Sequence, residues 1–217
     1  MNLAIFDLDE TLIAGDSATL WLTFLAERGL VSKALLAEER RLMDDYYAGT
    51  LDMNVYMALT LSPIEGRRPE ELAPLVEEFI TRHIAPIVYP QARERLAWHR
   101  AQGHRCLIIS ATGEHLVRPI AHHLGVADAI GVQTEIVQGR YSGRPEGVYS
   151  FQQGKVVRLG HWLREQGIEP GFCYGYSDSH NDLALLEHVD EAAVINGSDS
   201  LNALAVERGW QRLSWRF

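Results

Sequence analysis

Residues 3–12, LAIFDLDETL, place a short apolar run directly before two aspartates, Asp7 and Asp9. Similar runs follow, RCLIIS at 105–110, FCYGYS at 172–177 and AAVI at 192–195, and longer stretches with helical spacing separate them. Short strand-like runs that alternate with helices are typical of βαβ units, and unbroken hydrophobicity is typical of parallel strands covered on both faces. The sequence therefore predicts an α/β fold built on a Rossmann-like, doubly wound parallel sheet.

Further elements are expected around this sheet. The run WQRLSW at 210–215 predicts an edge strand, and Ile136 to Tyr141, with Gly139 between apolar neighbours, predicts a short hairpin. Pro90 and Gly103 mark the start and the end of one helix. The helices that the spacing predicts here lie near 91–102, 113–124, 153–166 and 180–188.

One long interval breaks the alternation of strands and helices. From Ser17 to about Ile84 the sequence has no strand-like run, only amphipathic stretches near 17–28, 32–47, 53–61 and 70–83. Ser17 and Ser32 are suited to helix N-caps, and Gly29 and Gly49 to helix ends. We expect a helical insert at 17–84 in a catalytic core formed by 1–16 and 85–217. Position alone leaves open that these helices pack on the sheet as ordinary layers.

Composition narrows the class of protein. The chain has 217 residues, 47% of them hydrophobic, which suits one α/β domain with an insert. Its net charge of −9, with no basic stripe, argues against binding to nucleic acid or to an anionic membrane surface. The first residues lack the basic and apolar regions of a secretion signal, and no run is long enough to span a membrane. Cys106 and Cys173 are expected to be reduced thiols, so we expect a cytoplasmic protein.

The residues able to do chemistry gather at strand ends. Asp7 and Asp9 end the first strand, Ser110 ends the second, and Asp178 comes just after the third, with Asp182 one helical turn later. The carboxyl ends of parallel strands meet in one crevice, so these distant residues should share a site. Carboxylates crowded in this way would repel one another unless a cation joined them, and Mg²⁺ with its oxygen ligands fits best.

The same crevice should bind an oxyanion. Lys155 near the start of a helix, Ser110, and the backbone amides of Ala111 and Thr112 are donors suited to a transferring phosphoryl group. The sequence has no serine–histidine–acid triad, no phosphate-binding P-loop and no dinucleotide fingerprint, which points to a carboxylate nucleophile. Asp7 could attack phosphorus, and Asp9 could act as general acid and base. Taken singly, each of these residues could instead be a turn or helix-cap residue.

These motifs resemble those of the haloacid dehalogenase-like superfamily. AIFDLDETL resembles its D-x-D-x-T motif, LIISAT its serine motif, GKVVRL its lysine motif and YSDSHNDLALL its metal motif. The resemblance implies Asp7 as nucleophile and metal ligand, Asp9 as acid/base and carbonyl ligand, and Asp178 as a metal ligand. The remaining roles that it implies are phosphate binding by Ser110 and Lys155, a phosphate pocket shaped in part by Asn181, and support by Thr11 and Asp182. The Ala111 amide noted above would contact the same phosphate. A second acid at Asp9 argues against halide displacement.

The helical insert is similar to the C1-type cap of the phosphoserine phosphatase-like branch, subfamily IB. That likeness places Asp16 where a glutamate holds the substrate amine, and Ala58 where an arginine would hold a carboxylate. A carboxylate without a guanidinium would be penalised, which favours an amino-alcohol phosphate, with histidinol phosphate of histidine biosynthesis as the first choice. Phosphoserine, phosphoethanolamine and phosphocholine are the alternatives. The aromatic side chains that could face the other end of the substrate are Trp21, Tyr46, Tyr47 and Tyr56, although core packing would also account for them.

Two other classes are compatible with these residues: a phosphotransferase or mutase, and a phosphate-binding or regulatory protein without turnover. No catalytic group is missing, which argues against the second. The expected partner is a small phosphorylated metabolite, and the expected assembly is a monomer or a small homo-oligomer. His115, His122 and His123 share one helical neighbourhood, but nothing completes a zinc set around them. His180 is expected to point away from the metal ion.

Overall fold

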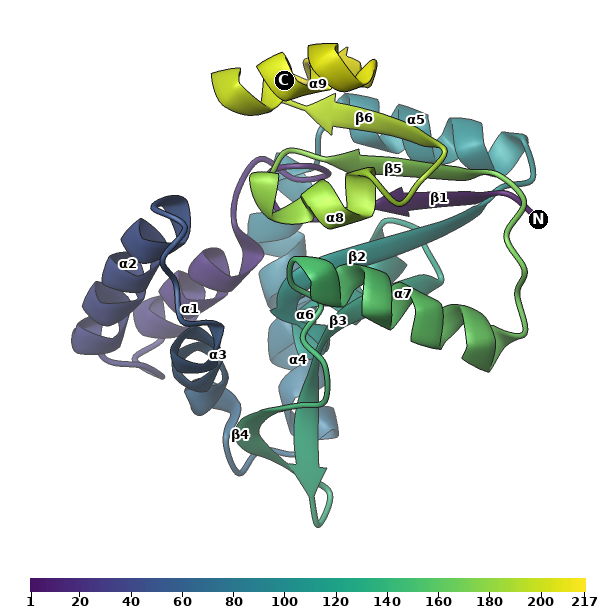
Figure 1. The fold of residues 1–217 in the computed structure, drawn as a ribbon. Helices are drawn as coiled ribbons and strands as arrows, with labels where there is room; N and C mark the ends of the chain where they lie inside the picture. Colours follow the sequence, from purple (N-terminus) through teal and green to yellow (C-terminus); the bar gives the residue numbers. More distant parts are fainter.

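A seven-stranded sheet forms the centre of the molecule (Figure 1). The computed structural model describes residues 1–217, with the exception of the Tyr47 side chain. The strand order is β4-β3-β2-β1-β5-β6-β7, and every neighbouring pair is parallel apart from the antiparallel pair β3 and β4. The strands are β1 Leu3–Phe6, β2 Arg105–Gly113, β3 Asp128–Val137, β4 Arg140–Glu146, β5 Cys173–Ser177, β6 Glu191–Ile195 and β7 Gln211–Leu213. The predicted α/β class and parallel sheet are confirmed.

Helices cover the two faces of the sheet, as a doubly wound fold requires. In Figure 1, α7 and α8 lie in front of the sheet, and α5 and α6 lie behind it. The helices after the first strand are α1 Ser17–Glu27, α2 Lys33–Tyr47, α3 Met53–Leu61, α4 Pro69–Phe79, α5 Pro90–Ala101, α6 Glu114–His123, α7 Gln153–Gln166, α8 Leu183–Leu186 and α9 Asp199–Arg208. Short 3₁₀ turns occupy Ser62–Ile64, Ala85–Ile87 and His180–Asp182, and a π-helical turn occupies Ile80–Ile84.

The central strand β1 explains why both faces need cover. Its side chains alternate between two apolar clusters: Ala4 and Phe6 join the larger one, and Leu3 and Ile5 join the one under α7. All four are fully buried. A strand that is apolar on both faces is stable only between two layers of helices, so the run LAIF fixes the position of Asp7, the next residue.

The helices predicted between residues 17 and 84 all form. In Figure 1, α1, α2 and α3 stand to one side of the sheet, whereas α4 runs back beside α6. Gly29 and Gly49 end α1 and α2 with φ values of 68° and 73°, and the Ser32 side chain caps α2. The predicted cap of α1 was wrong by one residue, because Asp16, not Ser17, accepts the hydrogen bond from the Thr19 amide.

The hairpin is longer than predicted. Its two-residue turn at Gln138 and Gly139 was located correctly, but β3 extends back to Asp128 and pairs with β2 in the main sheet. The prediction missed β3 because its apolar run at 129–132 is short, contains Gly131, and is followed by three polar residues at 133–135. The predicted helix at 180–188 is also shorter, with a 3₁₀ turn followed by α8.

The hairpin also attaches the helical insert, residues 17–84, to the sheet. The Gly66 amide donates to the Tyr141 carbonyl over 2.8 Å, and the Tyr141 amide donates to the Arg67 carbonyl over 2.9 Å. The Arg140 guanidinium adds a bond of 2.6 Å to the Gly66 carbonyl. The loop between α3 and α4 is therefore paired with β4 almost as another strand would be.

The structure bears on the two cysteines and on membrane-spanning helices. Cys106 on β2 and Cys173 on β5 are both free thiols, as predicted, and β1 lies between the two strands. Among the described residues, no helix is both long and apolar enough to cross a membrane.

Candidate active site

A cavity of about 430 Å³ opens at the carboxyl ends of the strands, between the sheet and the helical insert. Asp7 follows β1, Asp178 follows β5, and Ser110 lies near the end of β2, so the strands deliver all three to its floor. The predicted site residues that line the cavity are Asp7, Asp9, Asp16, Ser110, Ala111, Lys155, Asp178, Asn181 and Asp182. Thr11 lies beneath them and is fully buried.

Lys155 joins two of the aspartates. Its Nζ donates to Asp7 Oδ1 over 2.7 Å and to Asp182 Oδ2 over 2.8 Å, and Ser177 donates to the same Asp182 oxygen over 2.6 Å. Burial raises the pKa of the Asp7 carboxyl well above its ordinary value, and the Lys155 charge opposes that shift. Burial by itself would lower the pKa of Lys155, but the charges of Asp182 and Asp7 raise it overall. Lys155 is therefore the cation that lets Asp7 and Asp182 be buried together.

The local chain conformation aims Lys155 at this point. A tight turn at Phe151–Gly154 precedes α7, with a bond of 2.9 Å from the Gly154 amide to the Phe151 carbonyl. The α-carbon of Gly154 packs against the Tyr149 carbonyl, where a side chain has no space. Lys155 then enters in the first turn of α7.

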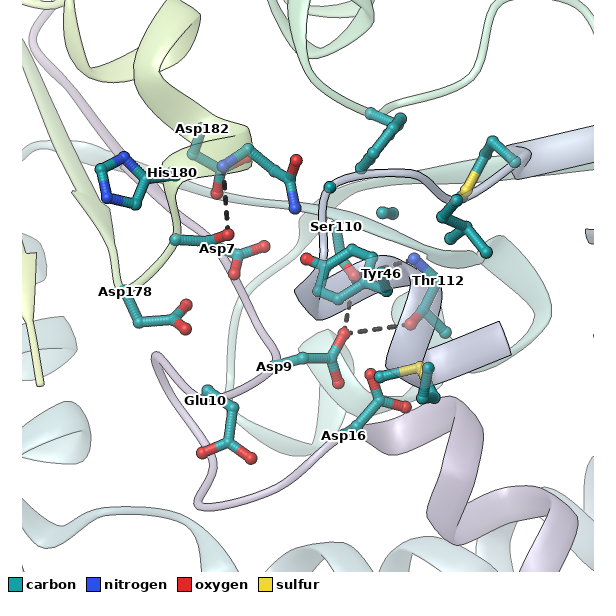
Figure 2. A pocket seen from close by; sticks show the side chains of 18 of the residues that line it. Asp7, Asp9, Glu10, Asp16, Tyr46, Ser110, Thr112, Asp178, His180 and Asp182 are labelled. Carbon is teal, nitrogen blue, oxygen red and sulfur yellow. Dashed lines mark hydrogen bonds between the residues drawn. The ribbon is translucent and has the colours of Figure 1, made fainter. Parts of the chain in front are cut away.

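Asp9 is held by three donors from separate segments. Its Oδ1 accepts the Ser17 amide over 2.7 Å, and its Oδ2 accepts the hydroxyls of Ser110 and Thr112, each over 3.0 Å. Figure 2 shows both hydroxyls directed at Asp9 across the floor of the cavity. The Asp9 side chain is thus fixed beside Asp7 rather than turned out as a simple helix cap.

Thr11 brings Asp178 next to Asp7. Its hydroxyl donates to Asp178 Oδ1 over 2.9 Å, accepts the Asp178 amide over 3.0 Å, and lies 3.4 Å from Asp7 Oδ2. Burial raises the pKa of Asp178 to about 7, and the Asp182 charge adds to the shift, although the Thr11 hydrogen bond opposes it. Asp7 and Asp178 therefore lie on the two sides of one hydroxyl and are close enough to share a ligand.

Two further groups complete the floor of the cavity. The backbone N–H of Asn181 donates to the Ser179 hydroxyl. The side-chain oxygen of Asn181 accepts a hydrogen bond from the Gln152 amide over 3.1 Å. Ala111 follows Ser110 on β2. His180 points away from Asp7 in Figure 2 and pairs with Ser200 over 2.8 Å, as the sequence predicted.

The other wall of the cavity comes from the helical insert and is mostly apolar. Asp16 lies on this side, and one of its oxygens caps α1 by accepting the Thr19 amide over 2.8 Å. Burial raises the pKa of Asp16 to about 7, and the charge of Asp9 adds to the shift. Glu39, which is buried and accepts the Thr19 hydroxyl, raises it further. The remaining lining of this wall is Met43, Tyr46, Leu51, Met53 and Tyr56, with Phe151 from the core.

The structure corrects two of the predictions for this wall. Trp21 does not line the cavity: it is 1% exposed and packs on Phe24 and Phe79 in the core. Ala58, matched to the position of a carboxylate-binding arginine, is exposed on α3 and does not line the cavity. Among the described side chains that line the cavity, none is an arginine. Of the other predicted aromatics, Tyr46 and Tyr56 line the cavity, and the Tyr47 side chain lies outside the described residues.

Sequence reasoning missed several lining residues. Thr112 was considered only for its backbone amide, yet its hydroxyl contacts Asp9. The signal was present: Ser110 and Thr112 are two residues apart in an extended strand, and such side chains face the same side. Phe151, Met43 and Met53 carried no signal, because an apolar residue on a loop or helix looks the same whether it lines a cavity or packs in a core.

The three histidines of α6 that the sequence singled out lie in two different environments. His115 is buried, and neither of its ring nitrogens has a hydrogen-bond partner. His122 and His123 are exposed on α6. No three histidine, cysteine or carboxylate side chains within the described part of the chain converge on one metal position.

Several known proteins are similar to this chain in sequence and in fold. A histidinol-phosphatase of Neisseria meningitidis is 39% identical over 220 residues, which cover 99% of both chains. A phosphoserine phosphatase of Mycobacterium tuberculosis is 32% identical, over 98% of this chain and 70% of its own. The crystal structure of a Bordetella pertussis protein of unknown function is 39% identical, with a TM-score of 0.89 over 98% of this chain and 97% of that one. The haloacid dehalogenase-like hydrolase family matches residues 4–187. The chain therefore belongs to the haloacid dehalogenase-like hydrolases and is a phosphatase of that family.

Proposed function

We propose that this phosphatase is a magnesium-dependent phosphomonoesterase that forms an aspartyl-phosphate on Asp7 and acts on histidinol phosphate. The observation that carries the proposal is the arrangement of Asp7, which lies between the Lys155 ammonium and Asp178 with Asp9 fixed beside it. This arrangement provides a nucleophile, a positive charge for a phosphate oxygen, a place for a cation and an acid/base.

The residues present fit a magnesium ion. Asp7 is buried and Asp178 is half-buried, burial raises the pKa of both carboxyl groups, and the two meet at the Thr11 hydroxyl. A divalent cation between them would favour their ionised forms. Mg²⁺ commonly takes only one or two carboxylates and keeps several waters, so the lack of a third acidic ligand is no obstacle. We propose that Asp7, Asp178 and the Asp9 carbonyl hold it, and that when bound it offsets the charge of the phosphate oxygens.

The reaction then proceeds in two steps on residues of this chain. In the first, an Asp7 oxygen bonds to phosphorus, the ester bond breaks, and Asp9 gives a proton to the departing alcohol oxygen. In the second, Asp9 takes a proton from a water that attacks the same phosphorus, and the bond to Asp7 breaks, which frees phosphate and restores the carboxylate. Lys155, Ser110, Asn181 and the Ala111 amide hold the phosphate oxygens throughout. Thr11 and Asp182 keep Asp178 and Lys155 in place.

The substrate assignment depends on the opposite wall of the cavity. We propose that residues 17–84 form a cap and that Asp16 binds the cationic amine of the leaving group. Asp16 is half-buried, with the buried Glu39 nearby. In the described lining of the cavity the one lysine or arginine is Lys155, which is paired with Asp7 and Asp182, so the Asp16 side suits a positively charged ligand. The absence of an arginine from the described lining disfavours a substrate carboxylate and thus phosphoserine. The imidazole of histidinol would lie among the tyrosines and methionines, and the full-length relative named histidinol-phosphatase supports this choice. We place the reaction in the cytoplasm.

Phosphate release from an aryl phosphate tests the reaction class. We expect turnover with Mg²⁺ and almost none after chelation. A binding protein would release no phosphate in either condition. A transferase or mutase would release little free phosphate. When a second alcohol was added, the phosphate would be transferred to that alcohol.

Asp16→Asn tests the substrate assignment. Asparagine can still cap α1, whereas alanine would also remove the cap and cost about 1 kcal/mol of stability. We expect KM for histidinol phosphate to rise about 10-fold or more, because a charge-assisted contact is lost, with little change for an aryl phosphate. In the wild type, kcat/KM should rank histidinol phosphate above phosphoethanolamine and phosphoserine. Equal loss on both substrates would refute the amine contact, and a preference for phosphoserine would refute histidinol phosphate.

A further inference from the structure

The Thr112 hydroxyl makes two hydrogen bonds beside the cavity. It donates to Asp9 Oδ2 over 3.0 Å, and it accepts the Ser17 hydroxyl over 3.4 Å. Thr112 is 6% exposed and Ser17 is fully buried, so both hydroxyls are largely shielded from bulk solvent. Both the donor and an acceptor position of this hydroxyl are used, and in Figure 2 it points across the floor of the cavity to Asp9.

The other donor to the same oxygen cannot hold Asp9 throughout the reaction. Ser110 shares Asp9 Oδ2 with Thr112, but a phosphate group in the cavity needs the Ser110 hydroxyl as a donor. A hydroxyl has a single proton to donate, so Ser110 must leave Asp9 when it binds phosphate. Thr112 and the Ser17 amide then remain, one on each oxygen of the carboxyl group.

We propose that Thr112 is a positioning residue that holds the carboxyl plane of Asp9 toward the leaving oxygen during phosphoryl transfer. This inference rests on the proposed role of Asp9 as general acid and base. A donor on each oxygen prevents rotation of the carboxyl group, and proton transfer needs the oxygen of the acid within hydrogen-bond reach of the leaving atom. Because Ser17 begins α1 and contacts both Asp9 and Thr112, the acid is aligned against the start of the cap as well as against the core.

The test compares leaving groups. An alkyl phosphate needs protonation of its leaving oxygen, whereas p-nitrophenyl phosphate has a leaving group stable enough to depart without it. The ratio kcat/KM reports steps up to phosphoryl transfer to Asp7, so it isolates the acid role from the later hydrolysis. For Thr112→Val we expect kcat/KM to fall about 10-fold or more on the alkyl phosphate, a fraction of the 10²–10⁴ that acid catalysis supplies, and less than about threefold on the aryl phosphate. Thr112→Ser, which keeps the hydroxyl, should restore the wild-type ratio of the two substrates.

Two further variants serve as references. Thr60→Val removes a buried hydroxyl that bonds only to the carbonyls of Tyr56 and Met57 on its own helix, so the substrate ratio should not change. Asp9→Asn should show the leaving-group effect in full. If Thr112→Val does not fold, Thr112→Ala, which places no additional methyl group at the site, is compared with Thr112→Ser in its place.

The outcomes separate the two claims. If Asp9→Asn slows both substrates equally, the proposed role of Asp9 fails. If Asp9→Asn discriminates between leaving groups but Thr112→Val slows both equally, or raises KM for both, Thr112 acts on phosphate binding or folding, and the inference is overturned. Discrimination by Thr112→Val with recovery in Thr112→Ser supports it.

Discussion

The two ends of the active-site cavity are built differently. At the phosphate end, Asp7, Asp9, Asp178 and Asp182 each have at least one side-chain or backbone partner from a distant segment of the chain. At the end under the helical insert, the hydrogen bonds of the Asp16 and Glu39 side chains to the described residues go to Thr19, and the surrounding wall is mostly methionine, leucine and tyrosine. The phosphate end is thus fixed by directional bonds and paired charge. The other end is shaped by packing, and its carboxyl groups have no lysine or arginine beside them in the described lining of the cavity.

Asp7→Asn should have the largest effect, because it removes the proposed nucleophile. We expect kcat/KM to fall by at least about 10³-fold on every phosphate ester, with no recovery on better leaving groups. The measurement is phosphate release with Mg²⁺, together with a melting curve. Without metal the variant should be at least as stable as the wild type, since one of several crowded buried carboxylates is gone. Residual activity within tenfold of wild type would require a different nucleophile.

Lys155→Met tests whether the phosphate end depends on its buried cation. Both Asp7 and Asp182 would lose the ammonium that now lies within 2.7 Å of each. Removing one partner from a buried ionic cluster costs about 3–5 kcal/mol, so we expect a loss of that size in the free energy of unfolding, measured by urea denaturation without Mg²⁺. Lys33→Met, at an exposed lysine, is the control and should change little. A loss below about 1 kcal/mol would contradict the contrast between the two ends.

His115 tests the apolar side at the base of the cap, where its ring lies between Trp21 and Tyr141. Burial lowers the pKa of His115 to about 3. The unfolded chain, with an ordinary pKa near 6.5, therefore takes up a proton as the pH falls below about 6.5, while the folded protein does not. The unfolding free energy that the neutral, buried His115 contributes at pH 7 is therefore lost as the pH falls below about 6.5.

Between pH 7 and pH 5, the wild type should lose about 2 kcal/mol of unfolding free energy relative to His115→Leu. Urea denaturation of both proteins with Mg²⁺ present gives this difference, in which the carboxylate contributions common to both proteins cancel. His122→Leu, at an exposed histidine, should track the wild type. Parallel pH curves for wild type and His115→Leu would show that His115 reaches water or a partner.

Tyr46→Phe should have the smallest effect on activity, and it tests a contact between the two ends of the cavity. The Tyr46 hydroxyl on α2 hydrogen-bonds to Asn181 and Ser179 of the core, although burial, the larger influence, raises its pKa. Loss of one neutral hydrogen bond is worth about 0.5–1.5 kcal/mol, so we expect kcat/KM for histidinol phosphate to fall about threefold. The control is Tyr149→Phe, because the Tyr149 hydroxyl joins the core to Asn54 outside the cavity. An equal loss in both variants would mean that the Tyr46 contact only stabilises the closed cap.

The same contrast explains what could be predicted from the sequence. Directional chemistry leaves a signature in residue type and spacing, so Asp7, Asp9, Ser110, Lys155 and Asp178 could be assigned to one cavity before any coordinates were considered. The helices of the insert could be located because amphipathic spacing and glycine ends are local signals.

Packing leaves no such signature. Trp21 and Tyr56 look alike in the sequence, three to four residues from other apolar side chains, yet one lies in the core and the other on the cavity wall. Ala58 was matched to the position of an arginine by comparing short stretches of sequence. Such a match does not show which face of the short helix α3 is directed to the cavity. β3 was missed because three polar residues, Gln133 to Glu135, interrupt its apolar pattern where the strand leaves the buried part of the sheet.

The pairing of Gly66 and Arg67 with Tyr141 has a mechanical consequence. These bonds use main-chain atoms, so substitutions that reshape the walls of the cavity leave them in place. If residues 17–84 form the proposed cap, we expect its α1, α2 and α3 to be held along the border between α3 and α4, so that an opening would turn about the loop at Gly66 and Arg67 and move α2 most. Amide protons of Gly66 and Tyr141 should accordingly exchange with deuterium slowly, whereas the solvent-facing amides at the end of α2 exchange fast.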